Sequence, residues 1–324
     1  MQTFRWGILA PGRIAGQFAE AVTALPDAAV AAVGSRDLGR AEAFAARHAI
    51  PRAYGSYAAL VADPDLDAIY VASPHSYHRD HVLLALAAGK PVLCEKPLGA
   101  TLEHAAAMIA AARRANLFLM EALWTRFLPA LSAARGWMDA GRIGPLRRLD
   151  ADFSFRCGWN PESRLLNPEL AGGGLLDVGV YVLSLAQWAF GSLPDPAASS
   201  AAIGKTGVDE QAAIIFQWPD GAQAVLTCGV RTPGTAHARL AGTDGSIEIP
   251  SFFSAQEAIL RAGGAEERVR TPHLKNGFEY EIAEAMACIR KGLLESPVLP
   301  WRDTLRLAEV SSGLIGQWGV RYPF

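Results

Sequence analysis

The chain has 324 residues, of which 51% are hydrophobic and 19% are charged, so it is long and apolar enough for two domains with separate cores. Its net charge of -2 leaves no basic excess for a nucleic-acid backbone or an anionic membrane surface. We therefore expect neither nucleic acid nor a membrane among its partners.

Cysteine usage and the N-terminus point to a cytoplasmic protein. Cys94, Cys157, Cys228 and Cys288 lie far apart without a paired CxxC spacing, which argues against a disulfide framework and against a structural zinc site. The N-terminal sequence MQTFRWGILAPGRIAG lacks the long apolar core of a signal peptide. No run of about 18 apolar residues occurs, so we expect no membrane-spanning helix.

The first third of the chain alternates short apolar runs with longer alanine-rich helical patterns. We expect strands over residues 6–10, 29–34, 68–73, 92–94 and 117–120, and helices over 13–25, 38–48, 78–88 and 102–116. This alternation predicts a Rossmann domain at residues 1–122, with a doubly wound parallel sheet.

The pattern changes in the second part of the chain, where strand-like segments follow one another across Gly, Pro and Asp turns. We expect strands near 146–156, 211–218, 222–230, 237–241 and 246–249, helices over 127–140, 175–190, 279–294 and 301–318, and a surface loop over 193–202. Residues 123–324 are thus predicted to form an α/β domain with a mostly antiparallel open sheet.

The loop APGRIAG, residues 10–16, joins the first strand to the first helix, where a Rossmann unit binds a pyrophosphate. Ala10 replaces the first glycine of the GxGxxG/A pattern, whereas Gly12 keeps the position at which the backbone approaches phosphate. The alternative is a plain strand-to-helix turn. The residues predicted to bind the pyrophosphate are Ala10, Pro11, Gly12, Arg13 and Ile14.

The end of the second strand reads Gly-Ser-Arg-Asp at residues 34–37. A carboxylate near this point binds the ribose 2′-hydroxyl of NAD, whereas an arginine accommodates the 2′-phosphate of NADP. We therefore predict that Arg36 and Ser35 bind the phosphate of NADP, which we favour over NAD. In the alternative, Arg36 is solvated and Asp37 caps the next helix; both roles are compatible, because Asp37 can cap while Arg36 binds.

Two further segments contain candidate catalytic residues. Glu95-Lys96-Pro97 follows the predicted strand 92–94, so Lys96 is expected to enter the ligand crevice instead of lying on the surface. In GGGLLDVGVY, residues 172–181, Asp177 and Tyr181 are four apart and would share one face of a helix. The glycine-rich entry would let this helix approach the other domain.

With these segments the sequence resembles the glucose–fructose oxidoreductase, inositol dehydrogenase and MocA family over essentially its whole length. Many members have histidine at the position of Tyr181. Tyrosine there, together with FLMEALWTRFLP at residues 118–129, resembles the branch of dimeric dihydrodiol dehydrogenase and NADP-dependent D-xylose dehydrogenase. The resemblance implies a homodimer in which Lys96 and Tyr181 are the catalytic pair.

The chemistry is consistent with that pair. A phenol with a pKa of about 10 is a weak base, but a nearby ammonium stabilises the phenolate. Tyr181 would take the substrate hydroxyl proton as hydride leaves for the nicotinamide, Lys96 would hold substrate or ribose, and Asp177 would orient either partner. The alternative makes Tyr181 a half-buried aromatic residue at a domain interface.

Other polar residues follow predicted strands. His75, His78 and His81 recur every third residue, which permits a metal cluster, but we favour a wall of the cofactor site and predict no metal. The alternative places His78 and His81 on a helix surface. The resemblance implies cofactor contacts at the ligand edge for Ser73, Pro74, His75, His78, Glu95, Trp124 and Arg126, while Arg156 and Trp159 are candidate substrate contacts.

The sequence therefore predicts an NADP-dependent oxidoreductase that moves hydride between the nicotinamide and a C–OH or C=O carbon. A D-xylose-like aldose and a trans-dihydrodiol both fit as substrates. Two alternatives remain open: an NAD(P)-dependent glycosidase of the same fold, and a non-enzymatic NAD(P)-binding sensor.

Overall fold

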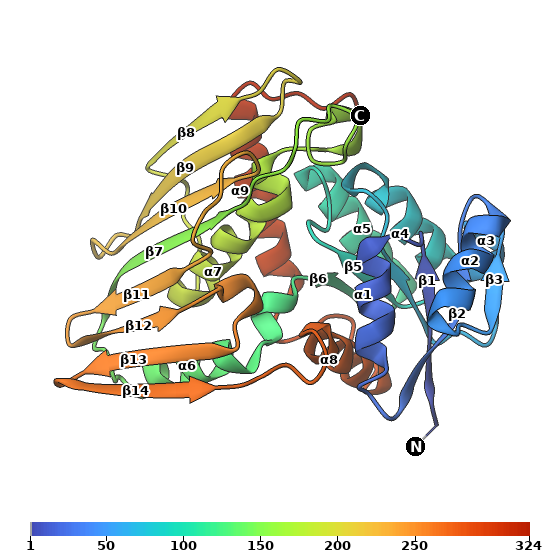
Figure 1. Ribbon diagram of the computed structural model, residues 1–324, viewed down its shortest axis with the longest axis horizontal. Helices are drawn as coiled ribbons and strands as arrows, with labels where there is room; N and C mark the ends of the chain where they lie inside the picture. The colour runs from blue at the N-terminus through green and yellow to red at the C-terminus, as the bar shows by residue number, and fades with distance from the viewer. Residues whose placement is uncertain (1) are drawn as a thin grey trace. The chain divides into compact units, whose positions relative to one another are not determined.

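The computed structural model describes residues 2–324, which separate into two compact units (Figure 1). The first unit comprises Met1–Trp124 together with Leu274–Leu305, and the second comprises Thr125–His273 together with Arg306–Phe324. This division differs from a single boundary after residue 122, because the chain returns to the first unit near its C-terminus.

The first unit is built on a six-stranded parallel sheet in the order β3-β2-β1-β4-β5-β6, which confirms the predicted Rossmann architecture. Its strands are β1 (Phe4–Leu9), β2 (Ala28–Gly34), β3 (Arg52–Tyr54), β4 (Ala68–Val71), β5 (Val92–Glu95) and β6 (Leu119–Ala122). Its helices are α1 (Arg13–Val22), α2 (Leu38–His48), α3 (Tyr57–Val61), α4 (His78–Ala87), α5 (Leu102–Ala115) and α8 (Phe278–Arg290). The sequence pattern did not predict β3 or α3.

Three aromatic side chains form the centre of this unit's core. Phe18 of α1 stacks on Tyr70 of β4 with ring centroids 3.8 Å apart, and its edge meets Trp6 of β1 at 5.4 Å. All three side chains are fully buried. The apolar face of α1 therefore packs against β1 and β4, the two central strands whose carboxyl ends flank the predicted ligand crevice.

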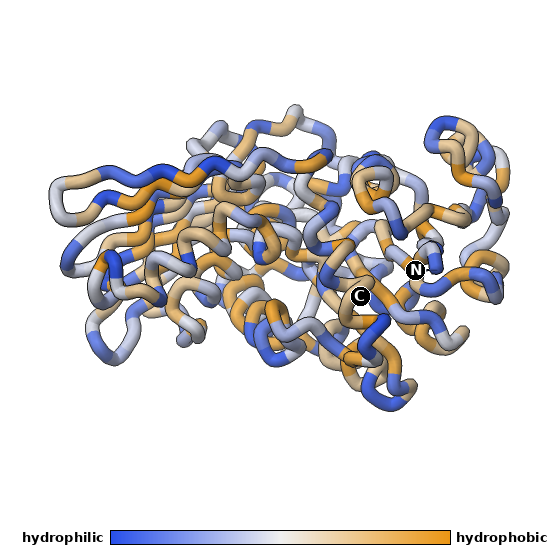
Figure 2. The backbone as a smooth tube through the Cα atoms, turned by 90° about the horizontal axis from the view of Figure 1, so that it is seen from below, coloured by the Kyte–Doolittle hydropathy of each residue, from blue (hydrophilic) through white to orange (hydrophobic). Residues whose placement is uncertain are grey.

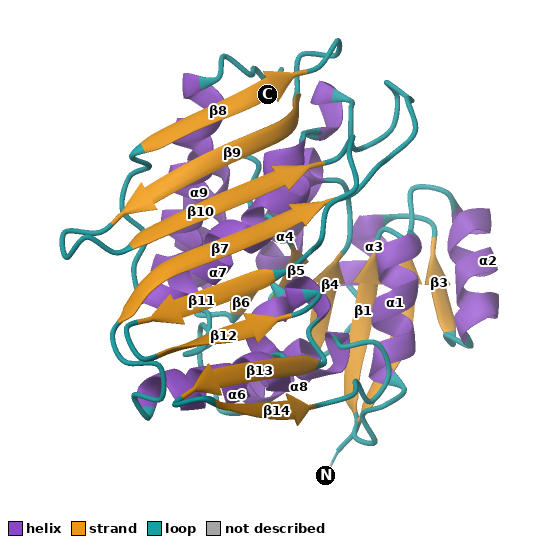
Figure 3. Ribbon diagram, turned by 60° about the vertical axis from the view of Figure 1, so that its left-hand side comes forward, coloured by secondary structure: helices purple, strands orange, loops and turns teal. Residues whose placement is uncertain are grey.

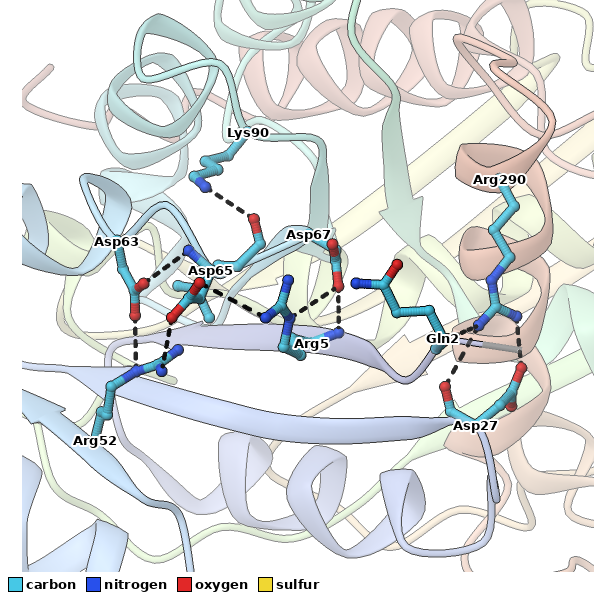
Figure 4. Close-up of polar contacts among 10 residues, drawn as sticks. Gln2, Arg5, Asp27, Arg52, Asp63, Asp65, Asp67, Lys90 and Arg290 are labelled. Carbon is cyan, nitrogen blue, oxygen red and sulfur yellow. Dashed lines mark hydrogen bonds and ion pairs between the residues drawn. The ribbon is translucent and has the colours of Figure 1, made fainter.

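The opposite edge of the sheet, at the amino ends of the strands, carries a network of ion pairs (Figure 4). Arg52 contacts Asp63 at 2.9 Å and Asp65 at 3.3 Å, and Arg5 contacts Asp65 and Asp67 at 3.7 and 3.6 Å. These pairs join β1 and β3 to the turn before β4. Since most of these side chains are partly exposed, each pair contributes about 0–1 kcal/mol, and we assign the network a structural role.

Helix α8 is tied to the first unit by polar contacts as well as by packing. Arg290 forms an ion pair with Asp27 at 2.5 Å, just before β2 (Figure 4), and the Asn276 side-chain amide donates to the Gln17 carbonyl at 2.9 Å. These contacts link the end of the sequence to α1 and β2, and they explain why this segment belongs with the Rossmann sheet.

The second unit contains an eight-stranded sheet in the order β14-β13-β12-β11-β7-β10-β9-β8. Only β7 and β10 pair in parallel, so the prediction of a mostly antiparallel sheet is confirmed. Helices α6 and α7 lie along one face (Figure 3). The elements are α6 (Pro129–Asp139), β7 (Leu146–Ser154), α7 (Val180–Phe190), β8 (Ala198–Ile203), β9 (Asp209–Gln217), β10 (Gln223–Gly229), β11 (Ala238–Gly242), β12 (Gly245–Ile249), β13 (Glu257–Ala262) and β14 (Ala265–Arg270). Helix α9 (Trp301–Gln317) begins with residues of the first unit, which ends at Leu305, and continues with residues of the second.

Three strands of this sheet, including both edge strands, depart from the sequence expectation. The stretch 193–202 was expected to be a surface loop, but it contains most of β8, whose sequence ASSAAI lacks the large β-branched residues of a typical strand. Strands β13 and β14 were not predicted, and the β14 sequence AEERVR is largely hydrophilic (Figure 2). Charged side chains on an edge strand protect it from pairing with other chains.

The helical segment Pro168–Phe190 is long and apolar enough to span a membrane by length and composition alone. Of its most apolar window, 89% is buried inside the protein, so it is the core helix of the second unit. Its hydropathy thus reflects packing under the sheet.

We expect Phe18→Ala to lower the free energy of unfolding by about 3–5 kcal/mol, because it removes a fully buried ring and leaves a cavity between α1 and β4. Chemical denaturation checks this value. Leu274→Ala, at a position in the same unit that is 68% exposed, is the control and should change stability by less than about 0.5 kcal/mol. Equal losses in the two variants would contradict this account of the core.

Candidate functional site

The parallel sheet brings the predicted cofactor segments to one edge of the first unit. The loops after β2, β1, β4 and β5 leave neighbouring strands at their carboxyl ends. The connection reverses direction between β1 and β4, which is the topological switch point where open α/β sheets bind ligands. Sequence segments up to about 90 residues apart therefore converge here because of strand order.

The loop after β1 has the features of a phosphate cradle. Ala10 adopts a left-handed backbone with φ 74°, and its N–H donates to the Gly34 carbonyl at 3.1 Å. Gly12 is extended, and a Cβ there would meet nothing within 4 Å. No side chain caps α1, and its first turn has no acidic residue. A free helix N-terminus beside an unobstructed glycine fits a pyrophosphate.

The loop after β2 has one exposed arginine. Ser35 is buried, and the Asp37 side chain accepts from the Arg40 N–H at 2.7 Å, which confirms Asp37 as the N-cap of α2. Arg36 is exposed and hydrogen bonds to Tyr57; burial raises the pKa of this phenol, and the Arg36 charge and hydrogen bond act against that shift. The capping role of Asp37 and the predicted role of Arg36 therefore coexist.

The loop after β4 gives the histidines different environments. His75 is buried at the start of a short 3-10 turn, after the half-buried Pro74. His81 is not on the surface: its Nδ1 lies 2.9 Å from the hydroxyl of the buried Ser73, and burial lowers its pKa to about 4. Among residues 2–324 no group of three or more His, Cys, Asp and Glu side chains is arranged so that it could hold a metal ion.

His78 is the most deeply buried of the three histidines. Its side chain is fully buried, with Nδ1 2.9 Å from the Pro97 carbonyl and Nε2 2.8 Å from the Ser73 carbonyl. These contacts do not fit the alternative of a residue on a helix surface. His78 connects the loop after β4 to the loop after β5, and its contact with the cofactor stays a prediction.

The Glu95-Lys96-Pro97 segment is held by buried carboxylates. Glu95 accepts a hydrogen bond from the Tyr70 hydroxyl. Glu121 accepts from the Leu98 N–H at 2.9 Å and from the Thr304 hydroxyl at 3.0 Å. Lys96 is half-buried, which does not fit the alternative of a fully solvated surface lysine.

A third acid, Glu281 of α8, was not predicted from the sequence. It is fully buried with no hydrogen-bond partner for either carboxylate oxygen, and burial together with the charge of Glu95 raises its pKa well above the usual range. Burial therefore favours the protonated form of Glu281. No local sequence signal marks it, because α8 reaches the sheet from the far end of the chain.

Trp124 and Arg126 are both buried. Trp124 stacks on Phe278 with ring centroids 4.8 Å apart, within the first unit. Arg126 belongs to the second unit, where Nη1 lies 3.4 Å from the carbonyl and hydroxyl oxygens of Ser184. These contacts connect Arg126 to α7, a packing role that the sequence did not predict.

Asp177 and Tyr181 lie on the buried helical stretch of the second unit. Residues Leu175–Gly179 form a π-helical turn that continues into α7. Asp177 pairs with Arg164 at 2.8 Å, and this arginine was missed because it lies in an irregular loop. The Tyr181 ring meets Phe153 edge-on at 5.3 Å. Since Lys96 belongs to the first unit, its pairing with Tyr181 stays a prediction.

The candidate substrate residues Arg156 and Trp159 are exposed. The guanidinium of Arg231 lies 5.5 Å from the Trp159 ring and donates to the Cys157 carbonyl at 2.7 Å. Arg156 also forms an isolated backbone bridge with Arg231. Arg231 therefore anchors the loop that presents both candidates.

A Rossmann sheet with a phosphate cradle and a following open-sheet unit defines a class of nicotinamide-dependent oxidoreductases. Residues 4–123 match the family described as "Oxidoreductase family, NAD-binding Rossmann fold", and residues 131–248 match the "GFO/IDH/MocA C-terminal domain". The chain belongs to the GFO/IDH/MocA family and is an NAD(P)-dependent dehydrogenase.

Similarity to individual proteins extends over the full length. The chain is 38% identical to the trans-1,2-dihydrobenzene-1,2-diol dehydrogenase of Mus musculus, with 98% of each chain covered. It is 36% identical to the Homo sapiens protein of the same name, again with 98% of each chain covered.

Solved structures agree. An aldose-aldose oxidoreductase from Caulobacter crescentus, complexed with glycerol, has a TM-score of 0.89 at 26% identity, with 98% of each chain covered. A 3-ketoreductase from Actinomadura kijaniata with NADP and TDP-benzene has a TM-score of 0.85 at 27% identity, with 96% of this chain and 97% of that chain covered.

We expect Ala10→Gly to stabilise the protein by about 0.5–1 kcal/mol, because glycine relieves the left-handed strain that Ala10 bears at φ 74°. Ala46→Gly, on the exposed face of α2, is the matched control and should cost about 1 kcal/mol. Thermal and urea unfolding of both variants would show opposite signs; a loss of stability in both would mean that Ala10 is not strained.

Proposed function

We propose that this protein is a cytoplasmic NADP-dependent dehydrogenase that oxidises the C–OH carbon of a trans-dihydrodiol. The observation that carries the proposal is the 36–38% identity to trans-1,2-dihydrobenzene-1,2-diol dehydrogenases over 98% of this chain. Tyr181 in the second unit and Lys96 in the first are the proposed catalytic pair.

The preference for NADP rests on the loop after β2. Arg36 is the exposed cation at the position where an NAD-binding enzyme carries a carboxylate, and Asp37 is engaged by the α2 N-terminus. A guanidinium can form a bidentate contact with the 2′-phosphate, and the N–H groups of the α1 N-terminus would hold the pyrophosphate. The similar 3-ketoreductase binds NADP, which supports this preference.

When bound, the nicotinamide supplies the hydride acceptor. Tyr181 would accept the proton of the substrate hydroxyl, and it would return a proton in the reverse reaction. Lys96 would favour the phenolate form of Tyr181 and hold the substrate oxygen. Asp177, which is buried and paired with Arg164, would keep that part of the helix in position without acting as a second base.

A D-xylose-like aldose is the second candidate substrate. The structural similarity to an aldose-aldose oxidoreductase at a TM-score of 0.89 favours it. The exposed Trp159 ring would suit either a sugar ring or a cyclohexadiene diol. The substrate assay below distinguishes the two.

We also propose a homodimer formed through the open sheet of the second unit. Strand β9 alternates buried and exposed residues, so one face of the sheet is left uncovered by the chain's own helices, and Ile215 on it is 39% exposed. Sedimentation at equilibrium should give twice the chain mass of 34.5 kDa, and a monomer at micromolar concentration would contradict the dimer.

The purified protein, given NADP⁺ or NAD⁺ with a trans-dihydrodiol, D-xylose, D-glucose or myo-inositol, should form reduced nicotinamide fastest with NADP⁺ and the dihydrodiol. Lys96→Ala and Tyr181→Phe should each lower kcat by at least about 100-fold, the scale of general acid–base catalysis. NADP binding without turnover on any substrate would instead favour the glycosidase or the sensor. A Tyr181→Phe variant as active as wild type would remove Tyr181 from the mechanism.

Arg36→Gln should weaken NADP⁺ binding by about 10–100-fold, because it removes a charge-assisted hydrogen bond, and should leave NAD⁺ binding nearly unchanged. Arg47→Gln, near the other end of α2, is the matched control and should affect neither cofactor. Isothermal titration measures both affinities. If Arg36→Gln weakened NADP⁺ and NAD⁺ binding equally, Arg36 would not bind the 2′-phosphate.

A further inference from the structure

A fully buried aspartate lies at the start of the helix that carries Tyr181. Asp209, the first residue of β9, accepts the Leu175 N–H at 2.6 Å through Oδ2, and the Gly174 N–H also bonds to this carboxylate. Leu175 begins the π-helical turn that contains Asp177 and leads into α7. Asp209 therefore occupies the N-terminal position where a negative charge stabilises a helix.

The glycine run at residues 172–174 is explained by this contact within the second unit. A Cβ on Gly173 would lie 2.3 Å from Asp209 Oδ1, and one on Gly174 would lie 3.3 Å from Oδ2. A Cβ on Gly172 would lie 2.9 Å from the Leu165 carbonyl. The absence of side chains at these positions lets the carboxylate reach the backbone N–H groups directly.

The second carboxylate oxygen, Oδ1, is buried without a hydrogen-bond partner. Burial raises the pKa of Asp209 to about 7, and the N–H donors act against that shift only in part. The carboxyl group thus changes its ionisation near neutral pH.

Several groups surround Asp209. The Cys228 thiol of β10 and the Tyr322 phenol both have raised pKa values because they are buried and interact with Asp209, so both are neutral at pH 7. Tyr322 donates its hydroxyl hydrogen to the Gly172 carbonyl at 2.7 Å. The neighbouring Glu210 is directed to Arg231, at 3.6 Å. Asp209 is therefore the group in this cluster that titrates near neutrality.

We propose that Asp209 is a positioning residue: its buried carboxyl group accepts backbone N–H groups and so holds the first turn of the helix that carries Tyr181. The proposal rests on the proposed catalytic role of Tyr181 for its effect on activity. The structural part is independent of that role, because it concerns the N–H groups of Gly174 and Leu175 alone.

Hydrogen–deuterium exchange of the 172–182 segment in the full-length protein, without substrate, tests the structural part. At pH 7 the segment should exchange about tenfold faster in Asp209→Ala than in the wild type, because the N–H groups of Gly174 and Leu175 lose their acceptor. Tyr181→Phe and Asp220→Ala should exchange at the wild-type rate. Wild-type protection in Asp209→Ala would overturn the proposal; if that variant does not fold, Asp209→Asn, whose amide oxygen is a weaker acceptor, should show a smaller increase, and no increase would overturn the proposal.

Activity at pH 8 tests the functional part. Asp209→Asn should lower kcat by about tenfold with little change in the KM for NADP⁺, because an amide oxygen accepts the Gly174 and Leu175 N–H groups less strongly than a carboxylate and the first unit is unchanged. Asp220→Asn, in an exposed turn of the same unit, is the matched control and should leave kcat unchanged. An unchanged kcat in Asp209→Asn would overturn the positioning role, whereas inactivity of the wild type toward every substrate would refute only the proposed function.

The pH dependence of stability tests the ionisation of Asp209. Folding raises the pKa of Asp209 from 3.8 to about 7, so the folded state holds this proton more tightly than the unfolded state. The contribution of this group to stability is fully present at a pH below its pKa in the unfolded state, and it is lost as the pH rises through its pKa in the folded state. The difference in Tm between the wild type and Asp209→Asn should therefore decrease as the pH rises from about 4 to about 7. A difference that does not change with pH would contradict the raised pKa of Asp209.

Discussion

The parallel order of the first sheet is the constraint on which the proposed cofactor site depends. Because β2, β1, β4 and β5 are neighbours that run in the same direction, the loops after them must leave from one edge. That edge has the uncapped α1 N-terminus, Arg36 and the Glu95-Lys96-Pro97 segment, while the opposite edge has the ion pairs around Arg5 and Arg52. Strand direction alone thus separates residues available for binding from residues that serve stability.

Buried carboxyl groups accept hydrogen bonds from the segments that contain the candidate catalytic residues. Glu95 and Glu121 accept hydrogen bonds around the Lys96 segment, and Asp209 does so beneath the helix of Tyr181. Burying a carboxylate costs free energy unless donors compensate, so each of these groups constrains the backbone that supplies the donors. The loops at these sites consequently need few apolar contacts of their own to hold their conformation.

The sequence predicted those features whose signal is local. Alternating apolar runs located the Rossmann strands, and the APGRIAG loop, Asp37 and the Glu-Lys-Pro segment were recognisable from neighbouring residues. Features that depend on contacts between distant residues were missed or misread. The contacts of His78 with the carbonyls of Ser73 and Pro97 could not be read from the sequence, and Arg164, Asp209 and Glu281 likewise gain their surroundings only through folding. Strand β8 escaped detection because small and polar residues form it.

The return of Leu274–Leu305 to the first unit has a consequence for synthesis on the ribosome. Edge strand β6 is bordered by this late segment: the Leu119 N–H donates to the Leu294 carbonyl, the Trp301 indole donates to the Leu119 carbonyl, and Thr304 donates to Glu121. Until that segment emerges, the nascent nucleotide-binding unit lacks these partners and Glu121 remains partly unsatisfied. Translation from the N-terminus therefore cannot complete the first unit before residues 274–305 have been synthesised.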